Sequence, residues 1–263
     1  TKKLSEEWMF LKARFRSNIG SKDLIQKKQL LISTAKGIEI GSQKFPLDIF
    51  KDCLGAELAK QAVCLSGPSF AIEVASGQPT GLTAASYLKS SAEKAQELFH
   101  APYFRVYTSD DPRGLEVAGA LKNIIAIAAG ACDGLGFGRN SLATIITRGL
   151  AEIFRYGQKL GANPLTFQGL SGVGDLFLTC SSVKSRNFTL GRRLGRGENL
   201  DHVLRTMGSV VEGVTTTKAA FELAEKLKVE APITSSVYGV LFEGNEVSKA
   251  AKNLMLRAPS AEL

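Results

Sequence analysis

Several classes of protein are excluded by what this sequence lacks. No apolar run approaches the roughly 18 residues that a membrane-spanning helix needs. The start of the chain lacks the apolar core of a secretory signal. The four cysteines form no CxxC pair and no metal-ligand spacing; they are Cys53, Cys64, Cys132 and Cys180. We therefore expect free thiols in a reducing compartment, no metal site and no membrane span.

One absence concerns nucleotide binding. A doubly wound nucleotide-binding domain normally opens with a strand and a GxGxxG turn, and nothing before Leu30 has that pattern. The segments after Leu30 nevertheless have the character of such a domain. We therefore expect its back half without its front half, and we interpret Thr1 as a fragment boundary or the start of an unusual gene product.

The charge is unevenly distributed. The net charge of +8 is concentrated in residues 1–29, a basic segment that we leave unassigned, and in residues 184–205. Neither segment interleaves its cations with aromatic residues, as a single-strand binding surface does. The second segment lies beside polar candidates for a site, so a small anionic substrate accounts for it better than nucleic acid does.

Two regions of different character follow residues 1–29. Short apolar runs alternate with helical patterns in residues 30–110, with strands expected at 30–34, 62–66, 81–85 and 104–107 and helices at 47–60, 69–76 and up to His100. That alternation predicts a parallel sheet with crossover helices. In residues 111–263 helical periodicity dominates, at 115–132, 141–160, 200–207, 214–227, 235–242 and 247–256. The predicted fold is thus α/β, a partial Rossmann-type parallel sheet, followed by an all-α domain.

Lys122 is the most informative residue, because it lies in the apolar stretch 117–129. Burial disfavours the ammonium form, so the pKa of such a lysine falls toward neutrality. A lysine tuned in this way exchanges protons near pH 7. The alternative is a lysine that reaches the surface along its own methylene stem.

Other polar motifs are weak individually. Lys36 and the pair Gly67 and Ser69 follow predicted strands, at the sheet edge where ligands of open α/β sheets bind. Asp175 ends a glycine-rich segment and either orients a lysine or caps the next turn. An arginine guanidinium can bind a phosphate through two parallel hydrogen bonds. The short polar run at 185–187, which contains Arg186, is therefore a candidate phosphate site. A Val-Val-Glu-Gly segment precedes a helix at 210–213.

Together and in this order, these motifs resemble the NAD(P)-dependent glycerol-3-phosphate dehydrogenase family of bacterial or plastid style. The stretches that carry the resemblance are 33–39, 65–71, 116–124, 169–175, 185–187 and 211–213. The resemblance implies a Rossmann domain followed by a helical domain like that of 6-phosphogluconate dehydrogenase. It also implies an oxidoreductase that interconverts sn-glycerol 3-phosphate and dihydroxyacetone phosphate, for glycerophospholipid synthesis, with NAD or NADP as cofactor.

The resemblance also implies roles for individual residues. Lys122 matches the catalytic proton acceptor. The remaining substrate-binding positions are Lys36, Gly67, Ser69, Asp175, Ser185, Arg186 and Asn187. Positions near the cofactor are Ala71, Arg186, Val210 and Glu212.

Other functions remain possible from the sequence. One is a related nicotinamide-dependent hydroxyacid dehydrogenase, and another is a truncated, catalytically dead homologue that binds or regulates. A nucleic-acid binder is the least favoured. The resemblance implies a cytoplasmic enzyme, with the plastid as the alternative compartment. The sequence leaves open a homodimer, the choice between NAD and NADP, and the role of residues 1–29.

Overall fold

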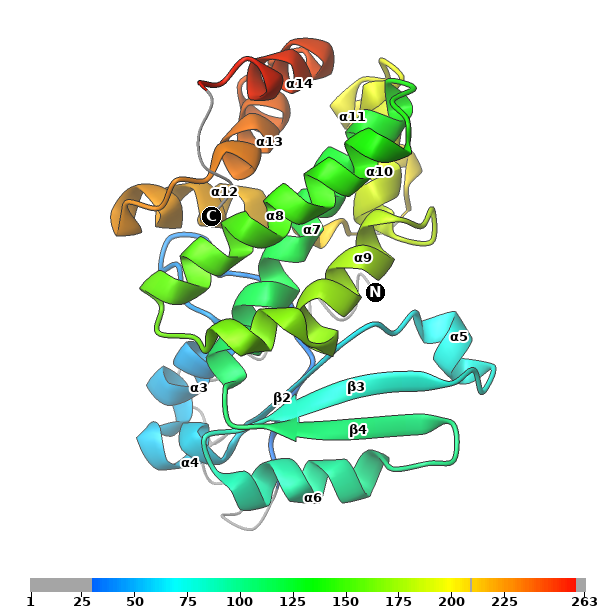
Figure 1. The fold of residues 1–263 in the computed structure, drawn as a ribbon. Helices are drawn as coiled ribbons and strands as arrows, with labels where there is room; N and C mark the ends of the chain where they lie inside the picture. Colours follow the sequence, from blue (N-terminus) through cyan, green and yellow to red (C-terminus); the bar gives the residue numbers. More distant parts are fainter. Residues whose placement is uncertain (1–29, 209, 259–263) are drawn as a thin grey trace.

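The computed structural model describes residues 30–208 and 210–258, which form a sheet with its helices and a helical region packed on it (Figure 1). The sheet has four strands that lie side by side in chain order: β1 (Ile32–Ser33), β2 (Val63–Ser66), β3 (Thr80–Ala85) and β4 (Phe104–Ser109). The predicted α/β part followed by helices is confirmed. The predicted basic segment 1–29 lies outside the described residues.

The sheet is mixed, so the prediction of an all-parallel sheet is wrong in one place. β1 pairs with β2 and β3 with β4 in parallel, but β2 and β3 are antiparallel. The connection between them contains only α5 (Ala71–Ala75). Five helical residues rise about 7 Å, so α5 is much shorter than an ordinary crossover helix that packs along the sheet. The chain instead turns back, and β3 starts near the end of β2.

The remaining helices of this part are α3 (Pro46–Leu54), α4 (Ala56–Gln61) and α6 (Lys89–Phe99). The single helix expected at 47–60 is two helices, because Gly55 between them has a φ of 92°. That conformation favours glycine and interrupts a right-handed helix. α6 covers one face of the sheet, where Leu82, Ala95 and Val106 share a buried cluster.

The helical part is organised around α7 (Pro112–Gly134). The helices that follow are α8 (Arg139–Lys159), α9 (Asp175–Cys180), α10 (Arg186–Gly195), α11 (Leu200–Thr206), α12 (Glu212–Leu227), α13 (Pro232–Phe242) and α14 (Val247–Met255). Between α8 and α9 lie the 3-10 helix η1 (Pro164–Gln168) and the π-helix η2 (Leu170–Gly174). η1, η2, α9 and α10 are not among the helices expected from the sequence.

α7 is a core helix. It is the only helix of the described residues that is long and apolar enough to cross a membrane, but 83% of its most apolar 18-residue window is buried inside the fold. Its apolar residues belong to the largest hydrophobic cluster, together with residues of α8, α10, α12 and α13. α7 therefore fixes the positions of the elements around it.

Charged residues near the start of α7 anchor α3. The Glu116 carboxylate accepts a hydrogen bond of 2.8 Å from the backbone N–H of Leu47, and Arg113 donates two hydrogen bonds to Asp48, at 2.9 and 2.6 Å. Burial raises the pKa of Glu116 to about 7, although Arg113 and the Leu47 N–H partly offset the effect. These contacts hold α3, and with it the loop after β1, against α7.

Glycines bring α7 and α10 into backbone contact. A Cβ on Gly130 would lie 2.0 Å from the Phe188 carbonyl oxygen, and a Cβ on Gly191 would lie 1.9 Å from the Ile127 carbonyl oxygen. Both distances are far shorter than any real contact. The close approach of these helices therefore requires glycine on both sides.

Gly191→Ala should be severely destabilising, because the added methyl group meets backbone atoms that cannot move independently. We expect a loss of at least about 3 kcal/mol in the free energy of unfolding, in the range of overpacked cores. Urea denaturation measures it. The control is Gly138→Ala, at a glycine with φ of −82° and no heavy atom within 4 Å of the added Cβ. A loss for Gly191→Ala no larger than that of the control would contradict the packing described here.

Candidate active site

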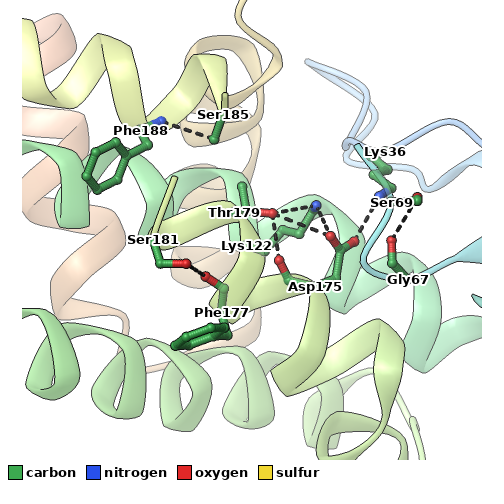
Figure 2. A network of polar contacts seen from close by, with 10 residues as sticks. All are labelled: Lys36, Gly67, Ser69, Lys122, Asp175, Phe177, Thr179, Ser181, Ser185 and Phe188. Atoms are coloured by element: carbon green, nitrogen blue, oxygen red, sulfur yellow. Dashed lines mark hydrogen bonds and ion pairs between the residues drawn. The ribbon is translucent and has the colours of Figure 1, made fainter. Parts of the chain in front are cut away.

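Lys122 is held inside the protein instead of reaching the surface. The residue is only 6% exposed. Its Nζ lies 2.6 Å from Asp175 Oδ1 and 2.8 Å from Thr179 Oγ1 (Figure 2). The alternative of a lysine that extends along its stem to solvent is therefore wrong, and the ammonium group has fixed partners.

Asp175 is shared between two lysines. Its second oxygen, Oδ2, accepts a hydrogen bond of 2.8 Å from Lys36 Nζ, so each carboxylate oxygen serves one lysine (Figure 2). Asp175 is 2% exposed, whereas Lys36 is partly exposed. The capping role that the sequence also allowed is not observed, since no side-chain cap bond forms at the start of α9. The structure thus joins Lys36, Lys122 and Asp175 in one cluster.

The two lysines have opposite pKa shifts. Burial lowers the pKa of Lys122 to about 8; the nearby positive charge of Lys36 acts in the same direction, and Asp175 opposes both. Burial also lowers the pKa of Lys36, but the Asp175 carboxylate, with smaller contributions from Lys122 and Glu212, outweighs it, so the Lys36 pKa lies above its ordinary value. Lys36 therefore stays charged near neutral pH, while Lys122 is poised to gain or lose a proton.

The geometry of the cluster depends on a local feature that the sequence analysis missed. Asp175 and Thr179 lie one turn apart on α9, and the Thr179 hydroxyl donates a hydrogen bond of 2.6 Å to the Asp175 carbonyl oxygen. This hydroxyl also contacts Lys122. The Asp-to-Thr spacing of four residues was the available signal, but it identifies a shared face only once a helix is recognised there.

The end of β2 lies against the Lys36 stem. A Cβ on Gly119 would lie 3.4 Å from Ser66 Oγ and 3.5 Å from Lys36 Cγ, which places these groups around one point on α7. Gly67 follows, with φ of 143° and Leu82 too close for a side chain. Ser69 donates a hydrogen bond of 3.1 Å to the Gly67 carbonyl oxygen (Figure 2). The predicted Gly67 and Ser69 thus neighbour the lysine cluster.

The run 185–187 is the beginning of a helix. Ser185 caps α10 by accepting a hydrogen bond of 3.3 Å from the Phe188 N–H. Buried Asn187 accepts one of 2.9 Å from the Gly213 N–H, which ties α10 to the start of α12. Ser185 and Asn187 therefore have backbone partners, and among the described residues neither forms a hydrogen bond with Lys122.

Arg186 differs from its basic neighbours. Lys184, Arg192 and Arg193 pair with Glu73, Asp133 and Glu198, respectively. Arg186 is exposed in the first turn of α10 and has no ion pair within residues 30–208 and 210–258. Its guanidinium remains free to bind an anion.

The other predicted cofactor positions lie at helix starts. Ala71 is the first residue of α5 and is exposed; Glu212 is the first residue of α12 and is also exposed. The negative charge of Glu212 contributes to the raised pKa of Lys36, so α12 begins within electrostatic reach of the cluster. Val210 precedes α12 and is partly buried.

The arrangement suits proton transfer to or from the oxygen of a small molecule. A lysine with a pKa near 8, oriented by a carboxylate and a hydroxyl, meets the requirements of a general acid or base. The cluster of Lys36, Lys122 and Asp175 lies between a Rossmann-like sheet and a helical region. Fold and site together define the class of two-part dehydrogenases.

Comparison with known proteins identifies the family. The model of the NAD-dependent glycerol-3-phosphate dehydrogenase C-terminus matches residues 111–252, and the N-terminus model of that family matches residues 14–92. The chain belongs to the NAD-dependent glycerol-3-phosphate dehydrogenase family. The N-terminal match includes residues 14–29, for which the sequence analysis found no counterpart.

Individual relatives agree. The chain is 53% identical over 238 residues to an NAD(P)+ glycerol-3-phosphate dehydrogenase of Enterococcus faecalis, covering 90% of this chain and 70% of the relative. A Bacillus cereus enzyme of the same name is 51% identical, with 92% and 71% covered. The crystal structure of glycerol-3-phosphate dehydrogenase from Coxiella burnetii aligns with a TM-score of 0.86 and 36% identity, over 93% of this chain and 74% of that one.

Lys36→Gln should raise the pKa of Lys122 above 8. The substitution removes a positive charge that disfavours the Lys122 ammonium. It also leaves Lys122 as the one lysine of the cluster that pairs with Asp175. A pH titration of the lysine Cε resonances in ¹³C-labelled protein measures the shift. Lys249→Gln, on exposed α14, is the matched control and should leave the titration unchanged. An unchanged Lys122 pKa in Lys36→Gln would show that Lys36 does not tune it.

Proposed function

We propose that this site interconverts sn-glycerol 3-phosphate and dihydroxyacetone phosphate with NAD or NADP; the relatives are named NAD(P)+ glycerol-3-phosphate dehydrogenases, which supports the proposal. The observation that carries the proposal is the buried Lys122, held by Asp175 and Thr179 and with a pKa of about 8. No feature of the described residues favours a carboxylate substrate, a non-catalytic role or nucleic-acid binding over this reaction.

Lys122 moves the proton of the C2 oxygen. In the oxidation, the neutral amine accepts the hydroxyl proton while the C2–H bond breaks and the C2=O bond forms. In the reduction, the ammonium returns a proton to the carbonyl oxygen. The oxidation rate therefore rises as pH increases through about 8, and the reduction rate falls there, because the required form of Lys122 changes.

Asp175 and Lys36 prepare Lys122 for this role. The carboxylate and the Thr179 hydroxyl fix the direction of Nζ, which limits the motion of the proton acceptor. The positive charge of Lys36 helps to keep Lys122 deprotonated at mildly alkaline pH. Lys36 stays charged and binds a second polar group of the substrate, with Gly67 and Ser69 beside it.

The residues near α7 fit a bound nicotinamide. The side-chain nitrogen of Asn123, next to Lys122 on α7, is buried and has no hydrogen-bond partner among the described residues. A buried unpaired donor calls for an acceptor from a ligand. Ala71, Arg186, Val210 and Glu212 would contact the cofactor. When bound, the nicotinamide supplies the site that takes or gives the C2 hydride.

The phosphate of the substrate goes to the start of α10. Arg186 provides an unpaired planar fork there, and bidentate guanidinium contacts match phosphate oxygens. Ser185 and Asn187 hold the first turn in place through Phe188 and Gly213.

The product serves glycerophospholipid synthesis in the cytoplasm, with the plastid as the alternative compartment. A homodimer remains a prediction.

Lys122→Met should reduce turnover by at least about 100-fold, the usual cost of losing an acid–base group. Methionine suits the apolar helix and Lys36 remains as the partner of Asp175, so the fold should persist. Steady-state kinetics measure the turnover, and circular dichroism shows whether the variant is folded. Lys249→Met is the control. A reduction of less than tenfold in a folded variant would make Lys122 a structural residue.

Arg186→Lys should raise the KM for glycerol 3-phosphate about tenfold or more, because the charge remains but the bidentate fork is lost. Glycerol, which lacks the phosphate, provides the comparison substrate and should be affected much less. Lys184→Arg, at a neighbouring cation already paired with Glu73, is the matched control. Equal losses for both substrates would show that Arg186 does not bind the phosphate.

A further inference from the structure

A second cleft is lined by residues outside the lysine cluster. It has a volume of about 350 Å³, within the range of small-molecule sites. One wall comes from β3 and β4 and the other from η1 and η2. Its polar lining residues all carry hydroxyl groups: Thr83, Tyr107, Thr108, Ser109, Thr166 and Ser171. None of Lys36, Lys122 and Asp175 lines this cleft, so it is not the site described above.

Ser171 indicates that the cleft is built for a ligand. The residue is 2% exposed, and its hydroxyl has no hydrogen-bond partner within the described part of the chain. Leaving a buried hydroxyl unpaired costs about 1–3 kcal/mol. A bound molecule with a hydroxyl or carbonyl oxygen would satisfy Ser171 once its side chain turns toward the cleft.

The surrounding charges select an uncharged ligand. The cleft is lined by no lysine, arginine, aspartate or glutamate. Directly behind it, the buried Asp111 carboxylate accepts a hydrogen bond of 2.6 Å from the Thr166 hydroxyl and one of 2.9 Å from the Asn163 N–H. On the other side, the Arg105 guanidinium lies over the ring of Tyr107, 5.3 Å from its centroid, so charges of both signs flank the uncharged lining. Hydroxyl-rich neutral molecules match that lining.

The cleft is mechanically connected to the catalytic cluster. Ser171 lies in η2, a π-helix that ends where Asp175 begins α9. π-Helical turns are rare and occur often at functional sites. Gly172 packs on the Phe167 backbone so closely that a Cβ would lie 2.1 Å from the Phe167 carbonyl oxygen. A ligand on Ser171 therefore acts on a short, tightly held segment that carries Asp175.

We propose that this cleft is an effector site for a small uncharged polyhydroxyl molecule of the sugar or cyclitol class. Binding at Ser171 fixes η2 and thereby changes how Asp175 holds Lys122. The binding does not depend on the proposed reaction, whereas the effect on turnover rests on the proposed function.

The first experiment measures binding to the full chain by saturation-transfer NMR, with D-glucose and myo-inositol as probes and glucose 6-phosphate as the anionic comparison. We expect saturable binding of at least one neutral probe and weaker binding of the phosphate ester. Ser171→Ala should weaken that binding about fivefold or more, the value of one hydrogen bond. Thr83→Trp, on the face of β3 that it shares with Tyr107 of β4, should block it by filling the cleft, and Thr144→Trp on exposed α8 is the matched control.

The second experiment measures kcat, KM and the pH profile with and without the bound probe. We expect the midpoint of the pH profile to shift in the unsubstituted chain and in Thr144→Trp, but not in Thr83→Trp. No saturable binding, binding that survives Thr83→Trp, or binding without any kinetic change would each overturn the effector site. Absence of turnover without any probe would instead contradict the proposed function, so the two failures are distinguishable.

Discussion

The structure depends on one carboxylate that lies between two ammonium groups. Asp175 gives one oxygen to Lys122 and the other to Lys36, and it is itself almost fully buried. Without it, two cations would face each other in a medium of low polarity. Breaking a buried pair of this kind typically costs about 3–5 kcal/mol. The loop after β1, α7 and α9 are thus joined through a single side chain, and the chemistry of Lys122 follows from that junction.

α7 provides the rigid support for this junction. Its apolar faces contact most of the helical region, and glycines allow α10 to approach its backbone. A lysine on a frequently moving element would find water and regain its ordinary pKa. Because α7 is packed on all sides, Lys122 stays desolvated and its proton affinity stays low. The same packing fixes the positions of Asn123 and Gly213. The proton acceptor on α7 therefore has a fixed position relative to the starts of α10 and α12.

The sequence predicted the members of the cluster better than their arrangement. The apolar surroundings of Lys122 indicated a perturbed lysine, and the resemblance to the family supplied Lys36 and Asp175. Thr179 was missed, since six residues of α9 are too few to show a helical period. The direction of β3 was also missed, because apolar runs indicate strands but not their orientation. Ser185 and Asn187 were predicted as ligands of substrate; the structure shows backbone partners for both, and their contact with substrate stays a prediction.

By itself, the sequence determined an α/β part followed by helices, the apolar surroundings of Lys122 and the resemblance to the family, because hydrophobic periodicity and local motifs are properties of neighbouring residues. The tertiary structure decided which charges meet. Lys36, Lys122 and Asp175 are separated by 86 and 53 positions along the chain, and their pKa values depend on distances between their charges and on the exclusion of water. Those quantities exist only after β1, α7 and α9 have packed together, so no local pattern can encode them.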